Sequence, residues 1–133
     1  MQFAGISYLA VLAAGIGGFL TGAMWYTVLG KLWLAALGKS ESEVKPTPGP
    51  FIVAAIGQLV MAFMFAGIVG HLGEITVINT MISAIFIWIG FIVTTMSVNH
   101  TFQGASPILT LIDTGHWLAV LLVMGLIIGL FGT

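Results

Sequence analysis

Four long runs of apolar residues, separated by short polar stretches, dominate the chain. They cover about residues 3–29, 51–70, 80–101 and 107–131. A transmembrane helix needs roughly 20 mainly apolar residues, because each residue of an α-helix rises about 1.5 Å. The pattern therefore predicts an all-α fold, a polytopic membrane protein whose four transmembrane helices form one bundle, with all 133 residues in a single domain.

The only long hydrophilic connection, residues 30–49, follows the first run. Within it, residues 31–37 predict a short interfacial helix that Gly38 closes, since glycine commonly ends helices. All three lysines lie in this connection: Lys31, Lys39 and Lys45. The positive-inside rule then predicts that the connection is cytoplasmic and that both termini lie outside. The first run lacks the positive start of a cleaved signal peptide, so we expect it to remain as an anchor.

The composition narrows the classes of function. Only 5% of the residues are charged, against about 25% in soluble domains, and the mean hydropathy is +1.18. A net charge of -1 offers no basic surface, so we expect membrane lipid, and not nucleic acid, as a partner. Cysteine is absent, which excludes disulfides, thiol chemistry and thiolate metal sites.

Small residues recur at four-residue spacing in the first and fourth runs, which allows membrane helices to approach each other closely. The predicted packing positions are Ala14, Gly18, Gly22, Gly125 and Gly129. Aromatic and basic residues cluster where the first run ends, and such residues suit the headgroup region of a bilayer. The expected interfacial anchors are Trp25, Tyr26, Lys31 and Trp33.

The fourth run contains Asp113 and His116, whereas the other three acidic residues and all lysines lie outside the apolar runs. A carboxylate in the hydrocarbon region is costly unless it is protonated, paired or beside water. Counting inward from the lysine-bearing side places four polar residues at about 9–12 Å depth, with His116 about one turn deeper than Asp113. The predicted intramembrane polar site is Asp113, His116, Gln58, Thr95 and Thr21.

Two interpretations of this site stay open. In the first, Gln58, Thr95 and Thr21 hydrogen-bond to Asp113 and fix the order of the helices, although such bonds contribute only about 0.6 kcal/mol on average in membranes. In the second, Asp113 responds to protons or ions, and His116 at i+3 can share a proton with it. The second interpretation predicts translocation or sensing of protons, ions or a small solute.

The fourth run also predicts contacts with protein on two sides. Its polar residues share one helical face, and Gly125 and Gly129 fall largely on the opposite face. A second subunit would supply one of these contacts, so we expect a homo-oligomer. The alternative is a non-catalytic accessory subunit of a larger membrane complex, which the small-residue stripes and the lack of a soluble domain also suit.

Recognised catalytic and cofactor motifs are absent from the sequence. It contains no G-x-S-x-G, phosphate loop or H-E-x-x-H. The three histidines fall at different depths, which does not suit haem, and Asp113 with His116 supplies two of the four ligands of a closed metal site. We expect no cofactor, and nothing favours an enzyme. A lipid- or quinone-handling enzyme would need a bound amphiphile near Trp117 and His100.

Two stretches carry a resemblance to a known family: G-A-M-W-Y-T-V-L-G-K-L-W at residues 22–33 and F-Q-G-A-S-P-I-L-T-L-I-D-T-G-H-W-L-A-V-L-L-V-M-G at residues 102–125. They resemble the domain-of-unknown-function family 1761, which comprises small bacterial membrane proteins of about four helices. The resemblance implies a location in the bacterial cytoplasmic membrane. It covers Trp25, Tyr26, Lys31, Phe102, Asp113 and Gly115, whereas Gln103, Gly104 and His116 depart from the family pattern. Since the family has no assigned activity, the resemblance leaves function open.

Overall fold

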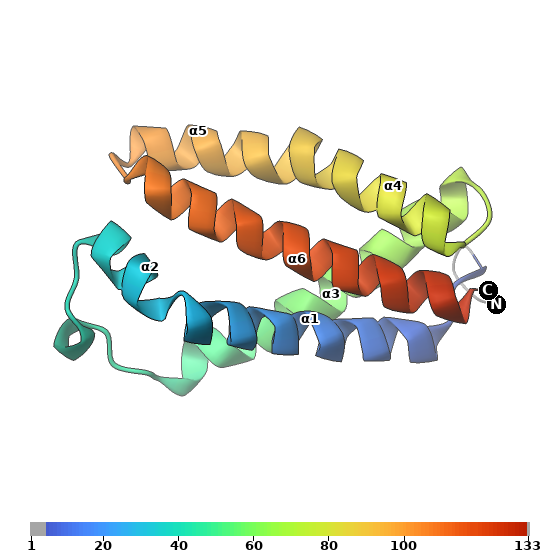
Figure 1. Ribbon diagram of the computed structural model, residues 1–133. Coiled ribbons are helices and arrows are strands. Elements are labelled where there is room, and N and C mark those ends of the chain that lie inside the picture. The colour runs from blue at the N-terminus through green and yellow to red at the C-terminus, as the bar shows by residue number, and fades with distance from the viewer. Residues whose placement is uncertain (1–4, 133) are drawn as a thin grey trace.

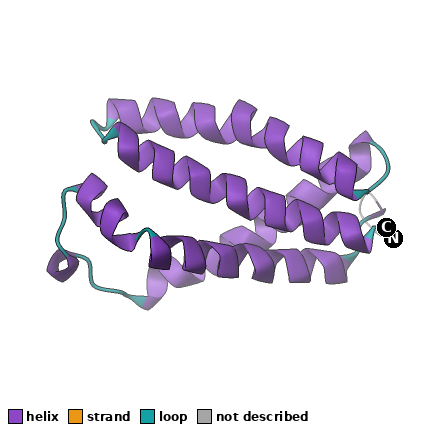
Figure 2. Ribbon diagram, in the orientation of Figure 1, coloured by secondary structure: helices purple, strands orange, loops and turns teal. Residues whose placement is uncertain are grey.

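Four membrane-length helices form the body of the protein in the computed structural model, which describes residues 5–132. They are α1 (Tyr8–Val28), α3 (Pro48–Leu72), a composite third span (Val77–Phe102) and α6 (Pro107–Phe131). Within the described range there is no strand, so the predicted all-α membrane fold is confirmed (Figures 1 and 2). Residues 3 and 4 of the first predicted run lie outside the described residues.

Side-chain caps determine where three of the spans begin. The hydroxyls of Ser7 and Ser106 each accept a hydrogen bond at 3.2 Å, from the amides of Ala10 and Ile108 respectively. Thr76 caps the third span in the same way, so this span starts three residues before the predicted position. The α3 helix also starts earlier than predicted, at Pro48, because proline in a first turn has no amide hydrogen to leave unpaired.

The third span changes its winding in the middle. It runs as α4 (Val77–Ile87), a π-helical segment η3 (Trp88–Val93) and α5 (Thr94–Phe102). Because π-helices bond i to i+5, such a segment rotates all later side chains by about one residue, or roughly 100°, relative to a regular α-helix. The Trp88 indole nitrogen in this segment donates to the carbonyl oxygen of Thr114 in α6 at 2.7 Å, which fastens the two spans together.

The connection after α1 contains the short helix predicted from the sequence. The α2 helix (Gly30–Leu37) follows α1 almost directly and ends at Gly38, whose φ of 72° is the left-handed conformation that glycine adopts most readily. A single turn, η2 (Glu41–Glu43), follows with a capping box between Ser40 and Glu43. The α2 helix folds back toward the beginning of α6, at the end of the bundle opposite the start of α1 (Figure 1).

The α6 helix is the central element of the bundle. It packs between α1 on one side and α4 on the other, and α3 crosses behind α1 (Figure 1). A Cβ atom added at Gly129 would lie 2.6 Å from Val77 Cα in α4, so the two backbones approach as closely as a glycine allows. Both sides of α6 are thus covered by helices of the same chain. The predicted homo-oligomer stays a prediction.

The apolar core occupies the half of the bundle that holds the start of α1 and the end of α6. We call this the closed half. Its fully buried side chains come from every span: Ala14, Ala62, Ala66, Ala84, Val120, Leu121, Met124 and Ile128. The half that holds α2 and the first turns of α3 and α6 contains no comparable cluster among the described residues. We call it the open half.

Candidate functional site

Asp113 lies in the open half, about two turns into α6, and takes its contacts from two other spans. Its Oδ1 accepts a hydrogen bond from the Tyr26 hydroxyl of α1 at 2.7 Å. Its Oδ2 lies 4.0 Å from His100 Nε2 of α5, and the two side chains are 17% and 15% exposed. The carboxylate is therefore paired with a phenol and an imidazole, and it keeps a small contact with the surroundings.

The imidazole is positioned by a second contact on its other nitrogen. His100 Nδ1 lies 2.8 Å from the Thr110 hydroxyl oxygen. Thr110 and Asp113 follow one another on the same face of α6, so the ring spans from one to the other. The short hairpin between α5 and α6, with Gly104 at a φ of 71°, brings the end of one helix beside the beginning of the next. Tyr26, His100, Thr110 and Asp113 thus form one connected group, which we call the carboxylate cluster.

Three of the expected partners of Asp113 do not reach it. The hydroxyl of Thr21 donates to the carbonyl of Gly17 in its own helix at 2.7 Å, and that of Thr95 donates to the carbonyl of Phe91. Thr95 is exposed, in agreement with the rotation that the π-helical segment imposes. Gln58 lies about 15 Å from the start of α3, because this helix begins at Pro48, earlier than predicted.

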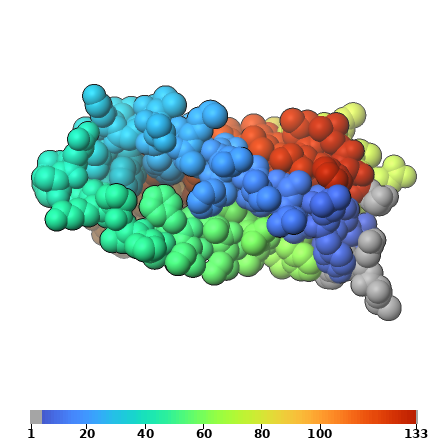
Figure 3. All heavy atoms as spheres, turned by 90° about the horizontal axis from the view of Figure 1, so that it is seen from below, coloured from blue at the N-terminus to red at the C-terminus, as the bar shows by residue number. Residues whose placement is uncertain are grey.

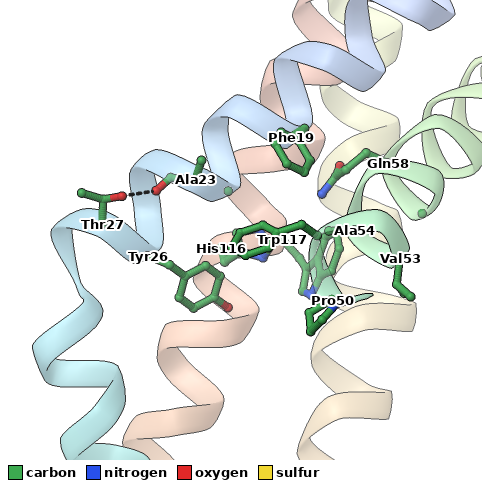
Figure 4. A pocket seen from close by; sticks show the side chains of 13 residues that line it. Phe19, Ala23, Tyr26, Thr27, Pro50, Val53, Ala54, Gln58, His116 and Trp117 are labelled. Atoms are coloured by element: carbon green, nitrogen blue, oxygen red, sulfur yellow. Dashed lines mark hydrogen bonds between the residues drawn. The ribbon is translucent and has the colours of Figure 1, made fainter. Parts of the chain in front are cut away.

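Gln58 and His116 lie together, deeper than Asp113, at a cavity of about 820 Å³ between α1, α3 and α6 (Figure 4). Both side chains are buried, with 4% and 6% exposure. Gln58 Oε1 and His116 Nδ1 have no hydrogen-bond partner in the described part of the chain. The His116 ring packs against Tyr26 and Trp117, with centroid distances of 4.9 and 4.5 Å. Tyr26 therefore touches both this cavity and Asp113.

The small residues of α1 lie where other helices come closest. A Cβ at Gly18 would lie 2.5 Å from Met124 Cε and 2.6 Å from Gln58 Oε1, and a Cβ at Gly22 would lie 2.8 Å from His116 Nε2. Ala14 is fully buried in the same stripe. On α6, Gly125 and Gly129 face α4, where a Cβ at Gly125 would meet the Thr80 carbonyl oxygen at 3.3 Å.

The aromatic residues expected as anchors make specific contacts within the bundle. The Trp25 indole nitrogen donates to the carbonyl oxygen of Ile112 at 3.1 Å, and its ring lies over Gly115. Trp33 of α2 packs edge-to-face on Tyr26 with ring centroids 5.6 Å apart. Lys31 is exposed. The structure thus links α2, through Trp33 and Tyr26, to Asp113.

Sequence reasoning missed the roles of Tyr26 and His100. Tyr26 was assigned to the headgroup region, and His100 was considered as a haem ligand and as a neighbour of a bound amphiphile. The signal for His100 was present in the hairpin. His100 lies a few residues before the turn and Thr110 a few residues after it, so the two reach similar depths on neighbouring helices. For Tyr26 no such signal exists, because α1 and α6 are distant in sequence.

The arrangement offers little to a metal ion. No group of three or more histidine, cysteine, aspartate or glutamate side chains comes together among residues 5–132. The carboxylate cluster can instead hold and exchange protons, since it combines a carboxylate, an imidazole and two hydroxyl groups.

The family model described as a protein of unknown function, DUF1761, matches residues 9–129 of the chain. No curated protein and no solved structure matches it. The match covers the four spans except for Tyr8 and the last two residues of α6, and it includes every residue of the carboxylate cluster and the cavity.

Proposed function

This chain belongs to the DUF1761 family of proteins of unknown function, and we propose that it is a proton-responsive membrane protein with Asp113 as its titrating group. The observation that carries the proposal is the position of the Asp113 carboxylate, inside a membrane span, between the Tyr26 hydroxyl at 2.7 Å and His100 Nε2 at 4.0 Å. An ionisable residue inside a membrane segment marks a functional site by default, because its burial is otherwise unfavourable.

Sensing fits this geometry better than translocation. Asp113 is 17% exposed and lies about two turns from the start of α6, in the half of the bundle that bears α2. Beyond it, α6 continues into the closed half, where Val120, Leu121 and Met124 are at most 1% exposed. Protons therefore reach the carboxylate from one end of the bundle, and apolar packing separates it from the other end. We propose that the accessible end is cytoplasmic, since it bears the three lysines.

A change in charge at Asp113 acts first on Tyr26. The ionised carboxylate accepts the hydrogen bond from the Tyr26 hydroxyl, whereas a protonated carboxyl group is a weaker acceptor with a hydrogen of its own to donate. Tyr26 also contacts Trp33 of α2 and the ring of His116. Protonation thus alters contacts at the end of α1, and α2, which touches Tyr26 through Trp33, is the element that responds.

The sequence offers a sharp test, because Asp113 is its single aspartate. Protein labelled with ¹³C at the aspartate carboxyl carbon would give one carboxyl signal in a lipid nanodisc. We expect this signal to titrate, and we expect tryptophan fluorescence to change with the same midpoint, since Trp25 and Trp33 lie near the cluster. Asp113→Asn should abolish the fluorescence change. Glu74→Gln, which neutralises an exposed carboxylate near the opposite end, should preserve it.

Two results would contradict the proposal. The first is a fluorescence change that persists in Asp113→Asn. The second is an Asp113 signal that titrates with no matching change elsewhere. Proton flux across liposomes, measured in parallel, distinguishes the two activities. A flux that wild type supports and Asp113→Asn lacks would favour translocation over sensing.

A further inference from the structure

The cavity between α1, α3 and α6 has the size of a small-molecule site. Its volume of about 820 Å³ lies within the range of roughly 300–1,000 Å³ that such sites occupy. Pro50, in the first turn of α3, marks one end and Gln58 marks the other, about 12 Å further along the helix. Figure 3 shows the face on which α1 and α3 lie side by side, and Figure 4 shows the cavity between them.

Two buried polar side chains at the deep end lack partners. Gln58 Oε1 and His116 Nδ1 are unpaired in the described part of the chain, although their residues are only 4% and 6% exposed. Buried polar groups are nearly always hydrogen-bonded, and an unpaired one is costly. Gly18 and Gly22 make room for these side chains, since a Cβ at either position would collide with one of them. The chain thus holds two unpaired polar groups at this cavity, although apolar packing does not require them.

Trp117, which is half-buried beside them, offers an indole N–H. Buried or partly buried tryptophans usually find an acceptor for the indole N–H. Trp25 and Trp88 do so on main-chain oxygens, whereas no hydrogen bond of the Trp117 indole is found among the described residues. The rings of Tyr26, His116 and Trp117 form one aromatic wall, with neighbouring centroids 4.5–4.9 Å apart. A flat group bearing hydrogen-bonding atoms matches such a wall.

The lining also defines the charge of the occupant. The residues around the cavity include no lysine, arginine, aspartate or glutamate. A phosphate or carboxylate head would therefore find no charged partner there. At the mouth, Phe51 and Val53 are 56% and 71% exposed, so an apolar tail can leave along α3 toward lipid.

We infer that this cavity binds an uncharged amphiphile with a flat, carbonyl- or hydroxyl-bearing head of quinone-like chemistry, held at Gln58, His116 and Trp117 with its tail toward the bilayer. The amide of Gln58 can present either its oxygen or its NH₂ group by rotating half a turn, and neutral His116 can donate or accept according to its tautomer. Both the oxidised and the reduced form of such a head therefore find a partner. Asp113 does not line the cavity, so the inference is independent of the proton response.

Binding of decylubiquinone to the purified full-length protein tests the inference. Tryptophan quenching in nanodiscs should be saturable for wild type. Gln58→Leu and His116→Phe should each weaken binding about tenfold, which is the effect of one lost buried hydrogen bond. Met64→Leu, in the neighbouring apolar cavity, and Asp113→Asn should bind like wild type. Thermal unfolding of each variant, measured without ligand, separates weaker binding from misfolding.

Four outcomes would overturn the inference. One is quenching that rises linearly with the probe, as simple partition into lipid produces. Another is equal affinity in wild type, Gln58→Leu and His116→Phe. The third is tighter binding of dodecyl phosphate than of decylubiquinone, because an anionic head has no partner in the proposed site. If binding is lost in Asp113→Asn alone, the cavity inference fails and the proton-response proposal remains.

Discussion

The two halves of the bundle differ in how their helices meet. In the closed half, glycine brings α6 against α4 so closely that a Cβ at Gly129 would lie 2.6 Å from Val77 Cα, and Met124 and Ile128 are completely buried. In the open half, α3 stands away from α6 and leaves a cavity of about 820 Å³. Membrane helices associate through close packing and hydrogen bonds, since water does not drive them together. The closed half therefore supplies stability, and the open half holds groups whose presence has no packing benefit.

Of the substitutions considered, Gly129→Ala should change the free energy of unfolding most. The new methyl group would meet Val77 Cα and the Thr80 hydroxyl oxygen at 2.6 and 2.7 Å, so the backbones of α4 and α6 must separate. We expect a loss of about 3 kcal/mol in the free energy of unfolding, near the upper end for overpacking. Gly57→Ala, at a mid-span glycine with nothing within 4 Å, is the matched control. Denaturant unfolding in detergent measures both, and equal losses would refute the contrast.

Gln58→Leu should act in the opposite direction. Removing a buried amide that has no partner eliminates a desolvation cost, so the ligand-free protein should gain about 1 kcal/mol in the free energy of unfolding. Thermal unfolding after removal of bound lipid measures the gain. A loss of stability would show that the amide is bonded in the folded protein, and that the open half does not hold an unsatisfied group.

Tyr26→Phe should have a smaller effect. It removes the hydrogen bond to Asp113 and leaves the ring contacts in place, so we expect a loss of about 0.6 kcal/mol, the average for such bonds in membranes. Tyr8→Phe is the control, because Tyr8 is the other tyrosine of the chain and is 52% exposed. A double-mutant cycle with Asp113→Asn isolates the pair. No coupling in that cycle would separate Tyr26 from the carboxylate cluster.

Thr95→Val should have the smallest effect. Its hydroxyl donates to a carbonyl of its own helix and its side chain is exposed, so the change in the free energy of unfolding should stay within about 0.5 kcal/mol. Thr110→Val changes the same atoms but removes the contact with His100, and should alter the pH response of tryptophan fluorescence. If Thr95→Val alters that response and Thr110→Val does not, the assignment of the carboxylate cluster is wrong.

The sequence could not predict the direction of Thr95 or the position of Gln58, and the structure shows the physical reason for each. Depth counting could not show the direction of the Thr95 side chain, because six residues of π-helix from Trp88 to Val93 rotate the later side chains of that span. For Gln58 the counted depth depends on where α3 begins. The first turn of α3 accepts Pro48 as readily as Pro50, and two residues shift the depth by about 3 Å.

The sequence by itself determined the four spans, the short helix that Gly38 ends and the presence of a carboxylate inside the last span, because helix length, capping and the cost of a charge in lipid are local properties. Only the tertiary structure decided which side chains meet that carboxylate. Tyr26 and Asp113 are 87 residues apart, and their contact depends on how α1 crosses α6. The cavity arises in the same way, from the separation of α3 and α6 beside Gly22. The packing of several helices sets such distances together.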